Sequence, residues 1–364
     1  MGPIYPHQVK TLARECGFEL AGIAAAAPVA EAGYYAQWVA EGMAGEMGYL
    51  TDRRAELRKD PRQLLPSARS MLCVGKLYNG PQPYSTQFAG EDLAWISRYA
   101  WGEDYHQLLR RGLERVVEGL RAASPAPFEW KICVDTAPLL ERAYARQAGL
   151  GWIAKNTCLI NEAMGSWFFL GELLLSLELA PDQPPADRCG SCTRCIDACP
   201  TSAIVPAGPA AGSHDAPAWA LDARLCISYF TIELRGAAPE DSRPAIGRHV
   251  FGCDICQDVC PWNRRAPATA EPAFAPAHFA PPLEKLAMVS ETEFREMFRA
   301  SPIARARYAG FLRNVAIAMG NARKERFRAP LEKLAARAEP VVSESARWAL
   351  RQLECTPPAR PGPA

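Results

Sequence analysis

Two closely spaced runs of cysteine are the residues of this 364-residue chain best suited to chemistry. The first run reads C-G-S-C-T-R-C-I-D-A-C-P over 189–200, and the second reads C-D-I-C-Q-D-V-C-P over 253–261. The first has the C-x2-C-x2-C-x3-C-P spacing of bacterial two-cluster ferredoxins, in which three thiolates of one loop bind one cluster and the fourth binds the other. The second run lacks one cysteine of this pattern, and the lone Cys226 can supply it.

This spacing predicts two [4Fe–4S] clusters with crossed ligands. We expect the first cluster to be bound by Cys189, Cys192, Cys195 and Cys260. We expect the second to be bound by Cys199, Cys226, Cys253 and Cys256. Zinc is the alternative, because C-x2-C pairs also bind zinc. Eight cysteines, with a proline after both Cys199 and Cys260, favour the two clusters.

The segments around the cysteines predict an α/β domain before them and helices after them. Strand-forming stretches over 18–24, 70–75 and 130–134 alternate with helical patterns over 7–16, 105–122 and 139–149. We therefore divide the chain into an α/β domain over 1–180, a ferredoxin-like domain over 181–270 and a helical region over 283–356. Paired short helices in the last region resemble one unit of a HEAT-type repeat, which must pack on a neighbour to bury its apolar face.

Asp135 directly follows the predicted strand over 130–134. In α/β folds such positions face the ligand crevice. An aspartate just before a helix is also an ordinary N-cap, so the residues alone leave both roles open. The loop residues Lys155, Asn156 and Thr157 lie between buried segments, where ligand contacts are common. Residues 95–106 mix aromatic and charged side chains, and His106 alone is a weak indication of a metal ligand.

The charges balance overall but not along the chain. Lys and Arg number 41 against 40 Asp and Glu, whereas residues 295–364 hold 14 basic and 6 acidic residues, a net charge of +8. This excess indicates either a polyanionic partner or a solvated helical surface. We see no export signal and no apolar run long enough to span a membrane. Clustered cysteines also fit a reducing compartment, so we expect a cytoplasmic protein.

Several blocks together resemble the epoxyqueuosine reductase family. They are the first cysteine run, V-D-T-A-P-L-L-E-R-A-Y-A-R-Q-A-G-L-G-W-I-A-K-N-T over 134–157, C-I-S-Y-F-T-I-E-L-R-G over 226–236 and G-C-D-I-C-Q-D-V-C-P-W-N over 252–263. The likeness covers nearly the whole chain. Ala154 departs from it, since the family usually has glycine there, and glycine often marks a close backbone approach.

The resemblance implies a fold and a reaction. The fold is an α/β cobalamin-binding domain, a ferredoxin-like two-cluster domain and a C-terminal α-helical HEAT-like repeat. The implied reaction reduces epoxyqueuosine to queuosine at the wobble position of the tRNA anticodon, the final step of queuosine biosynthesis. It implies cob(II)alamin, two [4Fe–4S] clusters and an external one-electron donor such as flavodoxin or ferredoxin. We expect a monomer that does not bind membranes.

The resemblance also assigns residues. Asp135 is the expected proton donor, kept protonated at neutral pH by burial. The expected cobalamin contacts are Arg58, Arg98, Asp135, Lys155, Asn156, Thr157, Ser228, Asp254 and Ile255. The expected tRNA contacts are Tyr229, Thr231, Arg235, Arg305, Arg307, Arg313 and Lys324.

Two other functions compete with this interpretation. A ferredoxin-like electron carrier would explain the cysteines, but the long segment before Cys189 exceeds what a carrier needs. A reductive dehalogenase-like enzyme would share the cobalamin and the two clusters. The basic C-terminal segment and the lack of an export signal argue against it.

Overall fold

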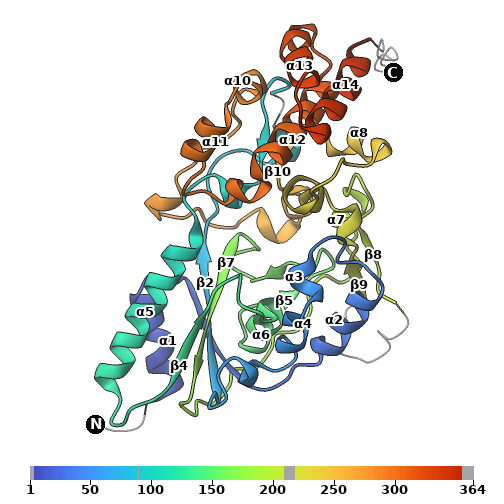
Figure 1. The fold of residues 1–364 in the computed structure, drawn as a ribbon. Helices are drawn as coiled ribbons and strands as arrows, with labels where there is room; N and C mark the ends of the chain where they lie inside the picture. Colours follow the sequence, from blue (N-terminus) through green and yellow to red (C-terminus); the bar gives the residue numbers. More distant parts are fainter. Residues whose placement is uncertain (1–3, 89, 209–217, 355–364) are drawn as a thin grey trace. The chain divides into compact units, whose positions relative to one another are not determined.

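The computed structural model describes residues 4–88, 90–208 and 218–354 (Figure 1). These residues form two compact units. The described residues within 1–82, 104–224 and 255–275 form the first unit, and those within 83–103, 225–254 and 276–354 form the second. The units interleave along the sequence, so they do not coincide with the three consecutive domains expected above. Residues 355 and 356 of the expected helical region lie outside the described part.

A four-stranded sheet forms the centre of the first unit. Its order is β1 (Leu20–Ala25), β2 (Ser70–Leu77), β7 (Phe168–Leu175) and β4 (Trp130–Cys133). Every neighbouring pair is antiparallel. This corrects the expected α/β class at this level, because alternation of helices and strands along a sequence does not determine strand direction.

Helices cover both faces of this sheet (Figure 1). The long α5 (Tyr105–Ala123) and α1 (Pro6–Glu15) lie on one face, and α6 (Glu141–Gln147) lies on the other. A methyl group added at Gly171 of β7 would lie 3.3 Å from Leu109 and Leu113 of α5. Side chains alternate along a strand, so the next residue, Glu172, points to the α6 face.

The remaining elements of the first unit are short. Between β1 and β2 the chain forms three helices, α2 (Glu31–Ala40), α3 (Gly48–Thr51) and α4 (Arg54–Leu57). Two small hairpins follow, β5 (Trp152–Ile153) with β6 (Leu159–Ile160), and β8 (Ile204–Pro206) with β9 (Trp219–Leu221). The cysteine runs lead into two single-turn helices that contact each other, α7 (Arg194–Asp197) and α9 (Ile255–Asp258).

The second unit is mainly helical, and most of its helices lie after residue 283, where the sequence predicts helices. A short parallel pair, β3 (Trp95–Ile96) and β10 (His249–Phe251), is accompanied by a π-helical turn over Tyr229–Glu233. The helices are α8 (Arg243–Ile246), α10 (Leu283–Ala287), α11 (Glu291–Met297), α12 (Arg307–Ala322), α13 (Arg328–Ala335) and α14 (Pro340–Glu354). Buried residues run along α12 from Phe311 to Gly320, and α13 and α14 pack against this helix.

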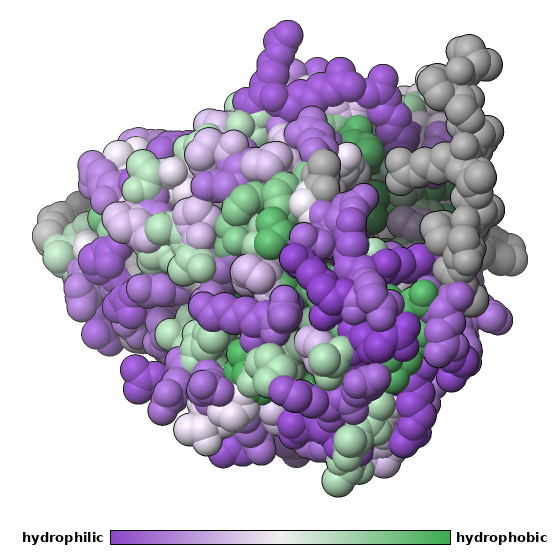
Figure 2. Space-filling model, turned by 90° about the horizontal axis from the view of Figure 1, so that it is seen from above, coloured by the Kyte–Doolittle hydropathy of each residue, from purple (hydrophilic) through white to green (hydrophobic). Residues whose placement is uncertain are grey.

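The face of the molecule in Figure 2 is mainly hydrophilic, with smaller hydrophobic groups between the polar side chains. Among the described residues, the exposed large hydrophobic side chains are Tyr5, Leu225, Met288 and Met297. In the part of the chain that the structure describes, no helix is both long and apolar enough to cross a membrane.

Candidate functional site

The four cysteines expected to bind the first cluster lie together in the first unit. Burial, followed by the neighbouring thiols Cys260, Cys189 and Cys192, raises the pKa of Cys195 to about 11. Cys260 is buried and packs with Trp152, and Cys189 lies against the same apolar cluster. The shared surroundings suit a bound metal cluster, because coordination deprotonates thiols that would otherwise stay neutral.

The arrangement of these thiols also bears on zinc. Among the described residues, no three Cys, His, Asp or Glu side chains lie close enough to hold a single metal ion. A [4Fe–4S] cube needs no such convergence, since each thiolate binds a different iron atom. Of the second expected set, Cys199 and Cys256 lie in the first unit, whereas Cys226 and Cys253 lie in the second. That ligand set stays a prediction.

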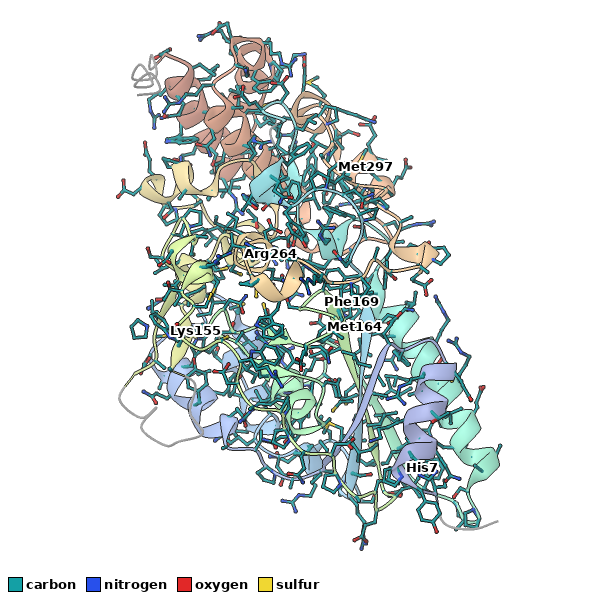
Figure 3. The ribbon with its side chains drawn as sticks, turned by 180° about the vertical axis from the view of Figure 1, so that it is seen from behind. His7, Lys155, Met164, Phe169, Arg264 and Met297 are labelled. Carbon is teal, nitrogen blue, oxygen red and sulfur yellow. The ribbon has the colours of Figure 1, made fainter. Side chains whose placement is uncertain are left out.

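The loop after β5 supports the backbone of both cysteine runs. Lys155 Nζ donates to the carbonyl oxygens of Gly190 at 2.7 Å and Cys192 at 3.0 Å. Figure 3 shows Lys155 beside the segment that carries the first run. Asn156 is buried and donates through Nδ2 to the carbonyl oxygen of Cys256 at 3.2 Å. The polar ends of Lys155 and Asn156 therefore bind the backbone of the cysteine segments. The sequence predicted cobalamin contacts for these two residues and did not predict this role.

Asp135 is not a helix cap. The helix that follows it, α6, begins at Glu141, and its N-cap is Leu140. The backbone of Asp135 is left-handed, with φ of 46°. This conformation is uncommon outside glycine and tends to occur at functional sites. The Asp135 carboxylate oxygen Oδ2 lies 3.0 Å from His106 Nε2.

His106 is itself held by a second carboxylate. Asp104 is the N-cap of α5, and its Oδ1 accepts the backbone N–H of His106 at 3.0 Å. The same oxygen lies 2.5 Å from His106 Nδ1. Hydrogen bonds to Asp104 and then to Asp135 raise the pKa of His106 from its ordinary value near 6.5 to about 9. The sequence did not predict this pair, because its only local signal is a histidine two residues after an N-cap aspartate.

The surroundings of Asp135 differ from the expected burial. Its side chain is 32% exposed, and its partner His106 is 28% exposed. Burial beside an apolar surface was expected to keep this carboxyl protonated, whereas the structure places a basic side chain against it. Burial therefore does not keep Asp135 protonated, and a proton for it must come from a neighbouring group.

Two further carboxyl groups, Glu141 and Glu172, lie close enough to Asp135 to interact with its charge. The sequence predicted neither of them as a site residue. Glu141 accepts a hydrogen bond from the backbone N–H of Asp135, and its Oε1 is buried without a partner. Burial, followed by the charge of Asp135, raises the pKa of Glu141 to about 8. Glu172 is completely buried, and neither of its oxygens has a hydrogen-bond partner. It lies opposite Cys73 and Cys133 on the neighbouring strands, and burial raises its pKa well above the ordinary value.

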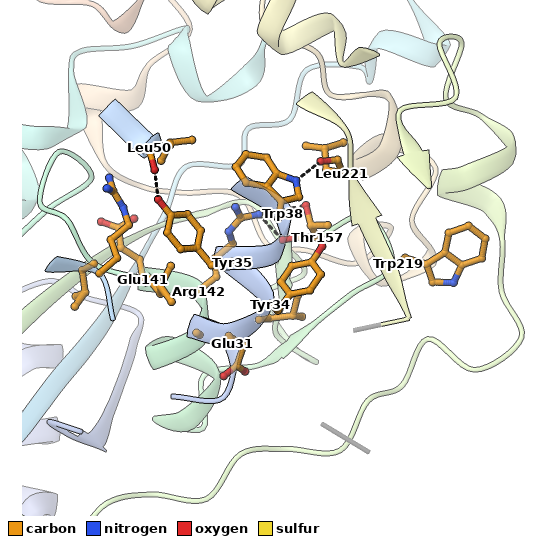
Figure 4. A pocket seen from close by; sticks show the side chains of 15 residues that line it. Glu31, Tyr34, Tyr35, Trp38, Leu50, Glu141, Arg142, Thr157, Trp219 and Leu221 are labelled. Atoms are coloured by element: carbon orange, nitrogen blue, oxygen red, sulfur yellow. Dashed lines mark hydrogen bonds between the residues drawn. The ribbon is translucent and has the colours of Figure 1, made fainter. Parts of the chain in front are cut away.

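A pocket of about 280 Å³ opens in the first unit next to Glu141 (Figure 4). Its wall is largely aromatic and apolar, and its lining includes Tyr34, Tyr35, Trp38, Leu50, Arg58, Glu141, Arg142, Thr157, Trp219 and Leu221. The guanidinium of Arg58 lies 6.0 Å from the centre of the Tyr35 ring and donates to the carbonyl oxygen of Tyr49 at 3.0 Å. Thr157, with φ of 62°, accepts hydrogen bonds from Arg142. Two of the expected cobalamin contacts, Arg58 and Thr157, thus line one pocket.

The expected cobalamin contacts of the second unit have internal partners. Asp254 is buried and accepts hydrogen bonds from the backbone N–H of Arg98 at 2.7 Å and from the hydroxyl of Ser97. The guanidinium of Arg98 lies 4.5 Å from the centre of the Trp101 ring. Ser228 directly precedes the π-helical turn. Ile255, the remaining residue of this set, opens α9 in the first unit.

The structure corrects part of the expected tRNA surface. Arg313 is only 1% exposed, and its guanidinium donates to the carbonyl oxygens of Leu234 at 2.8 Å and Gly236 at 2.6 Å. Thr231 is also 1% exposed and binds the backbone N–H of Gly252. Tyr229 is buried as well. These side chains therefore stabilise the second unit from inside. The prediction of tRNA contacts was wrong for them because an amphipathic helix pattern cannot distinguish a buried, fully bonded arginine from an exposed one.

The other expected tRNA contacts lie at the surface. Arg305 forms an ion pair with Glu233 at 2.9 Å, and Lys324 forms one with Glu91 at 2.6 Å. The side chains of Arg305 and Lys324 are each 41% exposed. Arg235 and Arg307 are exposed.

Comparisons with known proteins agree with this geometry. The family model described as "Epoxyqueuosine reductase QueG, DUF1730" matches residues 58–136, and the model "4Fe-4S double cluster binding domain" matches residues 188–263. An epoxyqueuosine reductase from Xanthomonas campestris is 42% identical over 351 residues, which are 95% of this chain and 95% of that protein. The chain belongs to the epoxyqueuosine reductase family.

Solved structures of epoxyqueuosine reductases share the fold. A crystal structure of one with an epoxyqueuosine-modified tRNA-Tyr stem loop has a TM-score of 0.81 at 29% identity and covers 95% of this chain and 89% of its own. The Bacillus subtilis epoxyqueuosine reductase has a TM-score of 0.82 at 27% identity, covering 95% and 90% of the two chains. In that structure a catalytic loop that contains an aspartate is swung out of the active site.

Proposed function

We propose that this chain reduces epoxyqueuosine to queuosine in tRNA, with Asp135 giving a proton to the departing epoxide oxygen. The observation that carries the proposal is the placement of Asp135. Its carboxyl is partly exposed, lies on a left-handed loop residue and is paired with His106 at 3.0 Å. An acid placed in this way can reach a substrate and be recharged by its partner. The swung-out loop of the Bacillus subtilis enzyme supports the idea that this loop moves during turnover.

Electrons would arrive through the two [4Fe–4S] clusters of residues 188–263. Each cluster carries one electron at a time, whereas removal of an epoxide oxygen needs two. Two clusters fed by an external one-electron donor, such as flavodoxin or ferredoxin, meet this demand. The thiolate ligands need a reducing environment, so we expect the enzyme to work in the cytoplasm.

Cobalamin is the third group that we assign to this chain. A corrin is several times larger than the pocket of about 280 Å³, so this pocket would receive only one edge of the cofactor against its aromatic wall. Arg58 and Thr157 would hold it there, and Arg98, Ser228, Asp254 and Ile255 stay further candidates. When bound, reduced cobalt supplies the strong reductant or nucleophile for the carbon–oxygen bond. The chain itself orients the ligand, excludes water and delivers protons through Asp135.

The substrate is the anticodon loop of tRNA, in line with the modified stem loop bound by the related enzyme. The wobble base lies in a single-stranded loop, so it can be turned toward the site without melting a duplex. Phosphate contacts would come from the exposed cations Arg235, Arg305, Arg307 and Lys324.

The decisive experiment is turnover of epoxyqueuosine-containing tRNA by the reconstituted enzyme with a chemical reductant. We expect queuosine in the tRNA only when cobalamin is added, and about eight iron atoms per chain. A chain that binds both clusters but never changes the tRNA would be an electron carrier instead. A chain that dechlorinates small aromatic compounds and leaves the tRNA unchanged would be a dehalogenase.

The ligand assignment has its own test. Replacing Cys226 by serine should damage only the cluster that also contains Cys199, so iron should fall from about eight to about four atoms per chain. Replacing Cys16 by serine is the matched control, because this thiol lies just after α1 and outside both runs. Unchanged iron in the Cys226 variant would remove this cysteine from the ligand set.

A further inference from the structure

Epoxide reduction needs more protons than Asp135 can hold. Converting the epoxide to an alkene breaks two carbon–oxygen bonds, takes up two electrons and two protons, and releases the oxygen as water. A single carboxyl carries one proton. A second group must therefore return a proton to Asp135 in each turnover.

We propose that His106, oriented by Asp104, is the residue that resupplies Asp135 with protons. This inference rests on the role of proton donor proposed for Asp135. It adds a positioning and proton-supplying pair, Asp104 and His106, which reaches the reacting oxygen only through Asp135.

The hydrogen bonds of the imidazole carry the argument. Nδ1 lies 2.5 Å from Asp104 Oδ1, and Nε2 lies 3.0 Å from Asp135 Oδ2. An ionised carboxylate only accepts hydrogen bonds, so an imidazole bonded to two of them carries a hydrogen on each nitrogen and is a cation. The backbone N–H of His106 also binds Asp104 Oδ1, which fixes the ring relative to the start of α5. Nε2 is thereby aimed at Asp135.

The charged groups around His106 favour the same state. Asp104 lies on its own helix, and Asp135 and Glu141 come from the segment after β4. The two aspartates raise the pKa of the imidazole to about 9, so it holds its proton at neutral pH. The side chain is 28% exposed, which allows recharging from water.

The proton path is then short. Asp135 Oδ2 first takes the proton of His106 Nε2 and passes it to the epoxide oxygen as the first carbon–oxygen bond breaks. His106 then takes a proton from water. A second transfer along the same path protonates the oxygen again, and it leaves as water. The two electrons come from the external donor through the clusters.

Full-length enzyme with both clusters and cobalamin can test this with His106→Gln and Asp104→Asn. Glutamine can still bind Asp135 but carries no transferable proton, so we expect turnover to fall about 10- to 100-fold. Wild-type turnover should decline as pH rises through about 9, the pKa of His106. In Asp104→Asn that decline should move to lower pH, because the imidazole loses its stronger carboxylate partner. His7→Gln on α1 is the matched control and should leave both rate and pH profile unchanged.

A second measurement does not depend on activity. The chain has five histidines, so ring-labelled histidine gives few NMR signals, and the one lost in His106→Gln identifies itself. We expect it to titrate near 9 in the wild type and lower in Asp104→Asn. If His106→Gln fails to fold, the one histidine signal whose titration moves in Asp104→Asn identifies His106 instead.

Three outcomes would overturn the inference: wild-type turnover in His106→Gln, a lower rate with an unmoved alkaline decline in Asp104→Asn, or a titration near the ordinary histidine value. Asp135→Asn separates this failure from that of the proposed donor. Normal turnover in Asp135→Asn would remove the donor role itself. An inactive Asp135→Asn beside a fully active His106→Gln would remove only the His106 relay.

Discussion

The acidic residues around Asp135 and the basic residues of the C-terminal helices carry their charge in opposite ways. Near Asp135 the groups are few and largely buried, and the pKa values of His106, Glu141 and Glu172 are all raised. On the C-terminal helices the cations are many and mostly exposed, and several of them are paired with acids. A few charged groups in a low-dielectric setting change chemistry more than many at the surface, because water screens each surface charge.

Ion pairing on the helices explains why the net charge of the C-terminal segment overstates the positive electrostatic field at their surface. Ion pairs join Arg305 to Glu233, Lys324 to Glu91, Arg326 to Asp92 and Arg351 to Glu240. All four acids precede residue 295, so they offset the +8 counted from the sequence. Within the described residues, Arg307 and Arg323 have no acidic partner.

The largest effect should come from the acidic side of the comparison. Asp135→Asn keeps a side chain that tolerates the left-handed backbone and can bind His106, but it removes the transferable proton. We expect turnover to fall by roughly two to four orders of magnitude, with iron content, cobalamin and tRNA binding retained. Rates can be measured on modified tRNA in a single turnover. Loss of cobalamin together with activity would instead make Asp135 a cofactor contact.

Glu172 tests whether burial alone sets the charge state on this side. Its pKa is raised in the folded chain, so the folded state keeps a proton that the unfolded state releases. Stability present at low pH is therefore lost as pH rises above the unfolded pKa. Relative to Glu172→Gln, the wild type should lose about 1.4 kcal/mol of unfolding free energy per pH unit in this range.

Urea unfolding at several pH values measures the difference between these two proteins. The exposed Glu178→Gln is a suitable control, since its side chain is 79% exposed and its pairing with Arg69 is at the surface. A pH-independent difference between wild type and Glu172→Gln would mean that the carboxyl finds compensation in the folded chain.

The smallest effect should come from the basic side. Changing Arg307 and Arg323 together to glutamine should weaken tRNA binding and lower the slope of log affinity against log salt by roughly 0.7 to 0.9 for each lost phosphate contact. The matched variant changes Arg326 and Arg351, which are already paired with acids. It should affect binding less. Equal losses in both variants would show that ion pairing does not decide which arginines meet the tRNA.

The cysteine spacing, the family blocks and the helical C-terminal region could all be predicted from the sequence. Each depends on residues close together in the chain: three thiols on one loop, or apolar positions that repeat along one helix. The Asp135 block was also recognisable, because its neighbours in sequence belong to the same motif. Motifs made of residues close together in the chain were therefore sufficient to identify the family and its chemistry.

Only the tertiary structure decided how these pieces are arranged. His106 lies 29 residues before Asp135, and the antiparallel sheet brings Glu172 between two cysteines of neighbouring strands. Arg313 looked like a surface cation until its burial among backbone carbonyls was visible. Such pairings form between elements distant in sequence, and their burial sets charge and hydrogen bonding. No local pattern of residue types contains that information, because the same pattern fits a buried and an exposed face.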